Sequence, residues 1–318
     1  MNTTHKIGIV IVNWNSGSQL AEAIHSVEKY HHGLVESVVI VDNASTDCSL
    51  SLVKASVGGG AFSLEIIRNA ENRGFGAACN QGAEALKSCS YVLFLNPDAR
   101  LLHNSLLLPL NYLQDVNHSH VGIVGVQLIN DLDLIDSSCS RFPSPLRFTM
   151  HAIGLDRILP RFGCRMKEWS HADTRKVDQV MGAFFFIRHQ VFQNLKGFDE
   201  RFFVYYEEVD VSYRAMKSGW SSVYLADAQA FHAGEGTSKQ VKAMRLFYSL
   251  RSRLIYASKH FSLFGFIVTL FATVLIEPIT RVALSATSRS SSSLAETLSG
   301  FKILFRWLAT WALHGETR

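Results

Sequence analysis

The stretch VVIVDNASTDCS, residues 38–49, decides the fold. Its first residues form a run of Val and Ile, which is typical of a strand buried on both faces of a parallel sheet. An acid, Asp42, ends this run, and Asn43 and Ser45 are residue types that cap a helix, with Asp47 in the first turn. The stretch therefore predicts a strand, a turn that carries a carboxylate, and a helix.

Similar apolar runs alternate with helical segments from residue 6 to about residue 128. We predict strands at residues 7–12, 38–41, 64–67, 91–95 and 121–126, and helices at residues 18–29, 47–57, 74–87 and 104–115. This βαβαβαβ order predicts an α/β fold with an open, doubly wound and mostly parallel sheet flanked by helices. Ligands bind such sheets beyond the carboxyl ends of the strands, so residues 13–15, 42–47 and 96–98 are the first place to look for a site.

The middle of the chain is less regular. Residues 130–176 contain several prolines and basic residues, and we interpret them as a variable insert or lid. The pattern sharpens again with a predicted strand at residues 177–188, a helix at 207–218 and a short strand at 222–225. These elements extend the first domain to about residue 240.

The composition changes after residue 240, so we predict a first domain at residues 1–240 and a helical region at 241–318. Residues 261–276 are apolar and uncharged, but a spanning helix needs roughly 20 such residues, and we expect Glu277 and Pro278 to end the run.

A serine-rich hinge at residues 288–293 then precedes an amphipathic helix at 294–313, with Phe301, Leu304, Phe305, Leu308 and Trp311 on one face. The apolar excess favours contact with a membrane surface. The alternative is packing on the first domain or on another subunit.

The overall composition excludes some classes of protein. Of 318 residues, 47% are hydrophobic, which excludes a disordered or fibrous chain. The formal charge of +4 falls far short of a nucleic-acid footprint, so we expect no nucleic-acid partner. Five cysteines without a CxxC pair indicate free thiols in a reducing cytosol. The apolar run near the N-terminus is too short for a signal peptide.

A second strand end carries Asn96 and Asp98 in the stretch YVLFLNPDA, residues 91–99. Because Asn96 and Asp98 are two residues apart in an extended segment, their side chains point to the same side. A carboxylate there could hold a hard divalent cation that offsets the charge of a diphosphate. The alternative is an Asx-type turn set by Pro97.

Asn72, Arg73 and Gly74 open the helix after the third strand, and Asn80 follows within it. Glycine at a helix start lets the backbone approach a phosphate, with which Arg73 could pair. A helix that packs tightly on the sheet explains the same spacing.

His232 follows the last strand and could complete a metal site, but a buried, hydrogen-bonded histidine is the simpler interpretation.

Glu207, Glu208 and Asp210 lie in the first turn of a predicted helix. Carboxylates this close raise one another's pKa, which suits a general base, whereas the helix N-terminus favours their charged forms. Asp210 is also spaced i, i+4 from Arg214, so that pair could be purely structural.

Together, these segments resemble the family-2 glycosyltransferases with a GT-A fold, from about residue 6 to residue 238. The matching stretches, in order, are IVIVNWNSG, VVIVDNASTDCS, ENRGFGAACNQG, YVLFLNPDA, MGAFFFIR, GFDERFFVYYEEVDVSYR and FHAGEGTS. The pattern is most similar to the rhamnosyltransferase-like branch, which builds surface polysaccharides such as O-antigen on lipid carriers.

The resemblance implies a role for each matching residue. Asp42 would contact the nucleotide base, and the remaining nucleotide-sugar contacts would come from Asn13, Asn72, Arg73, Gly74, Asn80, Asn96 and Gly182. Asp98 stands at the last acid of the family's DXD metal signature, whose first position here is Asn96. His232 would join the metal or diphosphate site, with Mg²⁺ or Mn²⁺ as cofactor. The family's Glu-Asp pair corresponds to Glu207 and Glu208, which leaves the base open between Glu208, Glu207 and Asp210.

The expected function is that of an inverting, metal-dependent glycosyltransferase at the cytoplasmic face of the inner membrane. Its partners would be a nucleotide-diphosphate sugar, with dTDP-rhamnose the first choice, and a lipid-linked glycan acceptor. A galactofuranosyl- or other hexosyltransferase that uses a UDP-sugar is the alternative within this class. A catalytically degenerate sugar-nucleotide binder is the alternative outside it. A nucleotidyltransferase would need a Gly-rich, basic loop after the first strand, where Asn13, Trp14 and Asn15 stand instead.

Overall fold

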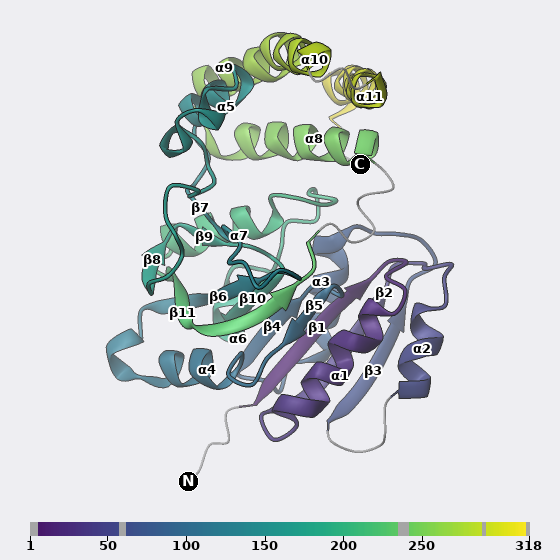
Figure 1. Cartoon of the computed structure of the whole chain (residues 1–318), viewed down its shortest axis with the longest axis vertical. Coiled ribbons are helices and arrows are strands. Elements are labelled where there is room, and N and C mark those ends of the chain that lie inside the picture. Colours follow the sequence, from purple (N-terminus) through teal and green to yellow (C-terminus); the bar gives the residue numbers. More distant parts are fainter. Residues whose placement is uncertain (1–5, 57–61, 235–241, 288–290, 316–318) are drawn as a thin grey trace. The chain divides into compact units, whose positions relative to one another are not determined.

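The computed structural model describes residues 6–56, 62–234, 242–287 and 291–315 of the chain (Figure 1). The chain divides into two compact units. The first comprises Met1–Ser140, Trp169–Glu200 and Glu207–Thr237, and the second comprises Arg141–Glu168, Arg201–Tyr206 and Ser238–Arg318. The division after residue 237 lies near the boundary expected at residue 240, but the second unit also includes most of the predicted insert.

A nine-stranded sheet forms the first unit, in the order β3-β2-β1-β4-β10-β6-β11-β5, with β8 paired to β11. The strands are β1 (Ile7–Asn13), β2 (Val35–Asp42), β3 (Ser63–Arg68), β4 (Tyr91–Leu95), β5 (Ala99–Leu101), β6 (Val121–Ile129), β8 (Arg175–Val177), β10 (Phe184–Arg188) and β11 (Ser221–His232). A separate pair joins β7 (Cys139–Ser140) to β9 (Gln179–Val180). The GT-A fold with its mostly parallel sheet is thereby confirmed.

Three features of the sheet differ from the sequence-based prediction. The segment predicted as one strand at residues 177–188 is divided among β8, β9 and β10. Strand β10 lies between β4 and β6 and runs antiparallel to both. The short strand predicted at residues 222–225 continues to His232 as β11, so its end pairs with β5.

Helices cover both faces of the sheet (Figure 1). They are α1 (Gln19–His31), α2 (Ser49–Ser56), α3 (Phe75–Ala85), α4 (Leu107–Gln114), η1 (Val116–His118), α6 (His189–Asn194) and α7 (Glu207–Lys217). Ile9 and Ile11 join the core cluster that includes Leu20 of α1, whereas Val10 lies on the α3 side. A Cβ on Gly82 would lie 2.5 Å from Val10 Cγ1, so only glycine allows α3 to approach β1 this closely.

The second unit is helical. It contains α5 (Pro145–Ala152), η2 (Leu155–Arg157), η3 (Pro160–Phe162), α8 (Lys242–His260), α9 (Leu263–Phe271), a π-helix (Ala272–Ile276), α10 (Glu277–Thr287) and α11 (Ser291–His314). The prediction that Glu277 and Pro278 end the apolar helix was wrong, because α10 continues through them. The wider π-helical turn directly before Pro278 relieves the clash that proline causes in a regular α-helix.

The amphipathic helix predicted at residues 294–313 exists within α11, but its apolar face packs against α8. Phe301 and Leu304 are buried, and Gly300 lies close to the carbonyl of Ala243. Phe305 on the same face is 46% exposed, so packing within the second unit, which was the alternative interpretation, accounts for part of this face. Its contact with a membrane stays a prediction. Residues 288–290 of the serine-rich hinge lie outside the described residues, and residues 291–293 open α11. All five cysteines are free thiols, as predicted.

Candidate active site

The first corner of the site lies where β1 and β2 end side by side. Asn13 and Asp42 are paired in register, and the Asn13 Nδ2 donates to Asp42 Oδ1 at 2.7 Å. Ser45 and Ser49 also receive hydrogen bonds from the Asn13 amide, at 3.0 and 2.8 Å. Asp42 Oδ2 accepts a longer hydrogen bond of 3.4 Å from the backbone N–H of Ser45, and no other within the described ranges of the chain. One oxygen of a buried carboxylate thus keeps most of its capacity to accept from a ligand.

The neighbouring strand adds a residue that the sequence analysis did not select. Asn69 follows β3 directly, and its backbone N–H donates to the Asp42 carbonyl at 2.9 Å. The Asn69 side chain donates to Asn43 Oδ1 at 2.8 Å and to Gln81 Oε1 at 2.9 Å. Its position after a strand, like that of Asp42, was the signal that could have identified it.

Gly74 begins α3 with φ 86°, a left-handed conformation that favours glycine. Its N–H donates to the side-chain Oδ1 of Asn72 at 2.9 Å, and its carbonyl accepts from the side chain of Asn43 at 3.1 Å. These bonds join the start of α3 to the turn after Asp42. Asn72 and Gly74 therefore lie beside the Asn13–Asp42 corner.

Arg73 and Asn80 are engaged elsewhere in the first unit. Asn80 exchanges two hydrogen bonds of 2.9 Å with the backbone of Phe198 and also contacts Glu200. Arg73 lies 3.9 Å from the carboxylate of the same Glu200, and both side chains are partly exposed. Asn80 thus holds a loop against α3, and its role in nucleotide-sugar binding stays a prediction.

The second corner joins Asp98 to His232. Antiparallel pairing of β5 with β11 places His232 opposite Ala99, and its Nε2 lies 3.6 Å from Asp98 Oδ1. Both residues are buried, with exposed fractions of 9% for Asp98 and 8% for His232. The buried Nδ1 of His232 has no hydrogen-bond partner within the described part of the chain. A carboxylate and an imidazole held in this way can serve as two ligands of a divalent cation.

A backbone link connects this corner with the acidic turn. The N–H of Asn96 donates to the Ala183 carbonyl at 3.1 Å, directly beside Gly182. A Cβ on Gly182 would lie 3.8 Å from Cγ of Glu208, so this glycine faces that side chain. Asn96, Gly182 and Glu208 are therefore linked by successive contacts at the end of β4.

Glu207 and Glu208 differ in their surroundings. Glu207 is buried, and burial, together with the charge of Glu208, raises its pKa well above the ordinary value. Burial also raises the pKa of Glu208, whose side chain is only partly buried. Each has a buried Oε2 atom without a hydrogen-bond partner among the residues that the structure describes. Burial therefore favours the protonated form of Glu207, whereas the less buried Glu208 is the more accessible of the two acids in the described part of the chain.

Asp210 has a structural task within α7. Its Oδ2 accepts a 2.7 Å hydrogen bond from Nε of Arg214, one helical turn later. Arg214 also donates to the carbonyls of Leu195 and Gly197, at 2.5 and 2.7 Å. The i, i+4 pair thus ties α7 to the loop before Phe198. Asp210 stays a predicted alternative base, but its carboxylate is already paired.

These corners share the carboxyl edge of the parallel strands. β1 pairs with both β2 and β4, with Ile11 opposite Leu95, so Asn13, Asp42 and Asp98 follow adjacent strands. The Gly-rich loop that follows His232 lies largely outside the described residues. Two carboxyl groups that differ in environment, a carboxylate–imidazole pair and the polar Asn13–Asp42 corner are side chains of the kinds that a group-transfer site uses.

A family model described as "Glycosyltransferase like family 2" matches residues 5–253. The chain belongs to this family. It is 28% identical to the N-acetylglucosaminyl-diphospho-decaprenol L-rhamnosyltransferase of Mycobacterium tuberculosis over 272 residues, which is 81% of this chain and 86% of that relative. It is also 27% identical to rhamnosyltransferase WbbL of Escherichia coli over 173 residues, covering 53% of this chain and 62% of that relative. These similarities support the rhamnosyltransferase-like branch of the glycosyltransferases.

Two solved structures have the same fold. Mannosyltransferase PcManGT from Pyrobaculum calidifontis, in complex with GDP-Man and Mn²⁺, has a TM-score of 0.55 and 18% identity, with 96% of this chain and 84% of that chain covered. GalNAc-T7 with UDP, GalNAc and Mn²⁺ has a TM-score of 0.58 and 16% identity, with 81% of this chain and 51% of that chain covered. At this identity, the comparison establishes the fold alone.

Proposed function

We propose that this glycosyltransferase moves a sugar from a nucleotide diphosphate onto a hydroxyl group of a lipid-linked glycan, with inversion at the anomeric carbon. The observation that carries the proposal is the partly buried Glu208 beside Gly182, one of whose carboxylate oxygens has no hydrogen-bond partner among the residues that the structure describes. Backbone contacts link it to the strand end that carries Asp98 and His232. A base and a diphosphate-binding pair on one sheet edge are what a direct displacement requires.

The donor is proposed to be dTDP-rhamnose. The names of both bacterial relatives specify rhamnose transfer. Asp42 Oδ2 is available to accept from the ring N–H of a thymine or uracil base, so this corner is compatible with dTDP- and UDP-sugars alike. The choice of rhamnose therefore rests on the relatives, and a UDP-hexose is the second candidate.

Asp98 and His232 are proposed to hold a divalent cation. The described residues contain no cluster of three or more His, Cys, Asp or Glu side chains, so two protein ligands are available here. Such a pair suits an ion whose other positions are filled by diphosphate oxygens and water, as is common for Mg²⁺. The imidazole nitrogen favours Mn²⁺ over Mg²⁺, because Mg²⁺ prefers oxygen ligands. When bound, the cation neutralises charge on the departing diphosphate.

In the proposed reaction, Glu208 takes the proton of the acceptor hydroxyl. The oxygen lone pair then forms a bond to the anomeric carbon, while the bond from that carbon to the phosphate oxygen breaks on the opposite side. The nucleoside diphosphate leaves with the bonding electrons. Asp42 and Asn13 orient the nucleotide, and the raised pKa of Glu207 favours its protonated form, which limits the negative charge beside Glu208.

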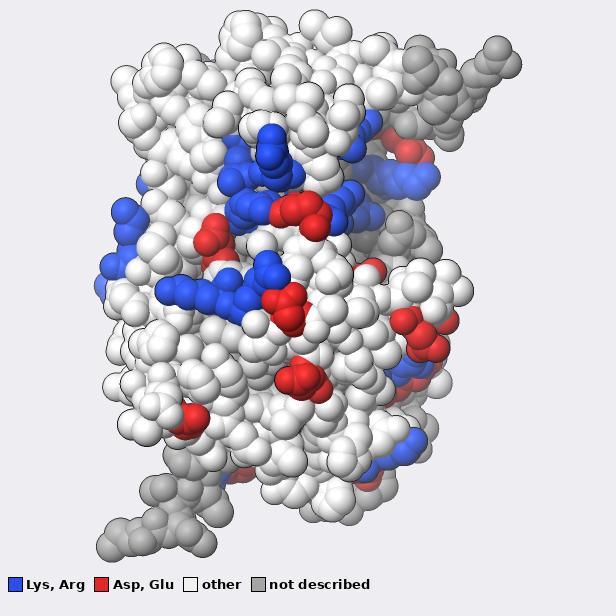
Figure 2. Space-filling view, turned by 60° about the vertical axis from the view of Figure 1, so that its left-hand side comes forward, with Lys and Arg blue, Asp and Glu red and all other residues white. Residues whose placement is uncertain are grey.

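The acceptor is proposed to be a lipid-linked glycan, in line with the decaprenol carrier in the name of one relative. Such an acceptor requires contact with a membrane surface. In the second unit, the helix at Leu263–Leu284 is long and apolar enough to cross a membrane, with a mean hydropathy of 2.0. Its most exposed apolar side chains include Leu263, Phe264, Ile267, Phe271 and Ile279. Figure 2 shows the largely uncharged surface of these helices, with Lys and Arg side chains at its border.

Basic residues accompany this apolar face within the second unit. Residues 141–168 carry six Lys or Arg against two Asp or Glu, and Arg157, Arg161, Arg165 and Lys167 are exposed. Helix α5 within this segment contacts α9, the π-helix and α10. An apolar face bordered by cations suits the surface of an anionic bilayer.

We infer that this helix lies on the bilayer and does not cross it. Glu277, in the middle of the helical run, is 2% exposed and forms ion pairs with Arg253, Arg281 and His151. A helix that crossed the membrane would have to leave these partners and carry an unpaired charge into lipid, which is costly. In-plane binding keeps the packed unit intact.

The transfer reaction is tested by release of nucleoside diphosphate from a panel of nucleotide sugars, with a lipid-linked acceptor and with or without Mn²⁺. We expect dTDP-rhamnose to turn over only with the metal present. Asp98→Asn should lower that rate at least about a hundredfold, since metal stabilisation is worth several kcal/mol and each 1.36 kcal/mol is tenfold. Asp133→Asn is the matched control, because Asp133 is exposed and its φ of 55° suits asparagine equally well.

Metal-independent turnover, or an Asp98→Asn variant with the wild-type rate, would overturn the metal assignment. Nucleotide binding without turnover of any donor would favour the degenerate sugar-nucleotide binder.

A further inference from the structure

The acidic turn is preceded by two residues in an unfavourable backbone conformation. Tyr205 and Tyr206 have φ values of 67° and 74°, and Glu207 follows directly. Bulky residues rarely adopt positive φ, at a cost of roughly 1–3 kcal/mol each. Such a conformation persists only where surrounding contacts impose it. The path of the chain into Glu207 and Glu208 therefore depends on what holds these tyrosines.

The segment Arg201–Tyr206 belongs to the second unit, where α8 holds it. Ser252 Oγ donates to the carbonyl of Val204 at 2.8 Å. The ring of Phe203 stacks on Tyr248, with centroids 4.7 Å apart and an interplanar angle of 17°. One face of α8 thus fixes both the backbone and a ring of this short segment.

Tyr206 is held by contacts of both its ring and its hydroxyl group. Its ring packs edge-on against Phe148 at 6.1 Å and lies 5.8 Å from Tyr256. Its hydroxyl is hydrogen-bonded to Arg253 of α8. Burial raises the pKa of Tyr206 to about 12, so the phenol is neutral at physiological pH. The hydroxyl is the polar anchor of the residue that precedes the acidic turn.

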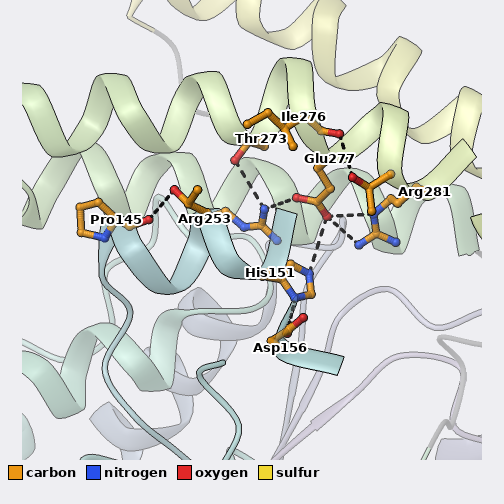
Figure 3. A network of polar contacts seen from close by, with 10 residues as sticks. Pro145, His151, Asp156, Arg253, Thr273, Ile276, Glu277 and Arg281 are labelled. Atoms are coloured by element: carbon orange, nitrogen blue, oxygen red, sulfur yellow. Dashed lines mark hydrogen bonds and ion pairs between the residues drawn. The ribbon is translucent and has the colours of Figure 1, made fainter. Parts of the chain in front are cut away.

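Arg253 is itself held in one orientation. It is 4% exposed, forms an ion pair with Glu277, and lies 5.1 Å from the ring of Phe148. Figure 3 shows Glu277 between Arg253 and Arg281, with His151 and Asp156 continuing the network. Burial would raise the pKa of Glu277, but the charges of Arg253 and Arg281 lower it to about 2, so this acid stays ionised.

We propose that Tyr206 and Arg253 are positioning residues for the catalytic turn. Arg253, fixed by Glu277, binds the Tyr206 hydroxyl and thereby holds the left-handed backbone from which Glu207 and Glu208 emerge. This inference rests on the proposed function, since it takes Glu208 as the base. Neither residue touches the reacting atoms, so their effect is on the placement of the base and not on donor binding.

Tyr206→Phe tests the proposal, because it removes the hydroxyl and retains the ring. We expect kcat to fall about tenfold, equivalent to 1.36 kcal/mol. The KM for the donor, and the affinity for nucleoside diphosphate with Mn²⁺, should stay within twofold of wild type. Tyr248→Phe is the control, because it removes a hydroxyl from a ring that stacks on the same segment. Its kcat should equal that of wild type, and both variants should be fully folded at the assay temperature.

A double-mutant cycle separates positioning from a general structural role. If Tyr206 acts through Glu208, Tyr206→Phe should have no further effect in a Glu208→Gln background. A wild-type kcat for Tyr206→Phe, a parallel loss of donor affinity, or additive losses in the double variant would each overturn the proposal. Full activity of Glu208→Gln alone would instead overturn the base assignment on which it rests.

Discussion

Glu208→Gln is expected to lower kcat by about 10²–10⁴, the usual contribution of a general base. Glutamine keeps the shape of the side chain beside Gly182 but cannot accept the proton of the acceptor hydroxyl. Affinity for the nucleotide sugar should be unchanged, because Asn13 and Asp42 lie at a different corner. Steady-state kinetics with the lipid-linked acceptor, together with calorimetric titration of nucleoside diphosphate, measure the two quantities.

Glu207→Gln is the matched comparison. Glu207 is buried and its pKa is raised well above the ordinary value, so a neutral amide resembles the protonated form that burial favours. Its loss of activity should therefore be much smaller. If Glu207→Gln is inactive and Glu208→Gln turns over normally, the base is Glu207.

The pH dependence of kcat should follow the ionisation of Glu208. Burial raises its pKa, and a base acts only when deprotonated. Activity should thus be present above this pKa and be lost as the pH falls through it. The acidic limb of the profile then lies at a higher pH than an ordinary glutamate would give.

Replacement of Leu263, Phe264, Ile267 and Phe271 by glutamine should abolish binding to anionic vesicles. Each of these side chains is at least half exposed, with values of 75%, 77%, 52% and 54%. Each partly inserted side chain contributes about 1 kcal/mol to the free energy of vesicle binding. The four substitutions together should therefore cost about 4 kcal/mol, which lowers the affinity for vesicles several hundredfold. Cosedimentation with vesicles that contain phosphatidylglycerol measures it, and zwitterionic vesicles should bind the wild type more weakly.

The control replaces Val116, Leu132 and Leu134 by glutamine, since these apolar side chains of the first unit are also exposed. It should bind vesicles like the wild type. Equal vesicle binding by both variants would contradict the assigned face. Unchanged affinity for nucleoside diphosphate shows that the fourfold α9 variant keeps a folded first unit.

The sheet and the first corner of the site were predictable because their signals are local. Continuous Val and Ile runs predicted the parallel strands, and polar residues at the strand ends predicted the meeting of Asn13 and Asp42. Asn69 was not selected as a site residue, because its position directly after a strand was not recognised.

The remaining features depend on contacts between distant residues. Nothing local to Phe184–Arg188 indicates that this strand inserts antiparallel between β4 and β6. The approach of His232 to Asp98 depends on the pairing of β5 with β11, which joins residues far apart in the sequence.

Glu277 and Pro278 show how tertiary contacts override a local stop signal. A charge followed by proline usually ends an apolar helix. Here, the buried ion pair with Arg253 compensates the charge, and the π-helix accommodates the proline. The apolar face of α11 likewise gave no indication of its partner, because α8 and a bilayer satisfy the same hydrophobic pattern.

The anomeric configuration of the product tests the central claim most directly. We propose a single displacement in which Glu208 deprotonates the acceptor while the diphosphate leaves from the opposite side of the sugar. NMR of the first glycan formed, compared with the donor, should show inversion at the anomeric carbon. Retention of configuration would require two displacements or attack from the leaving-group side, and would contradict this account.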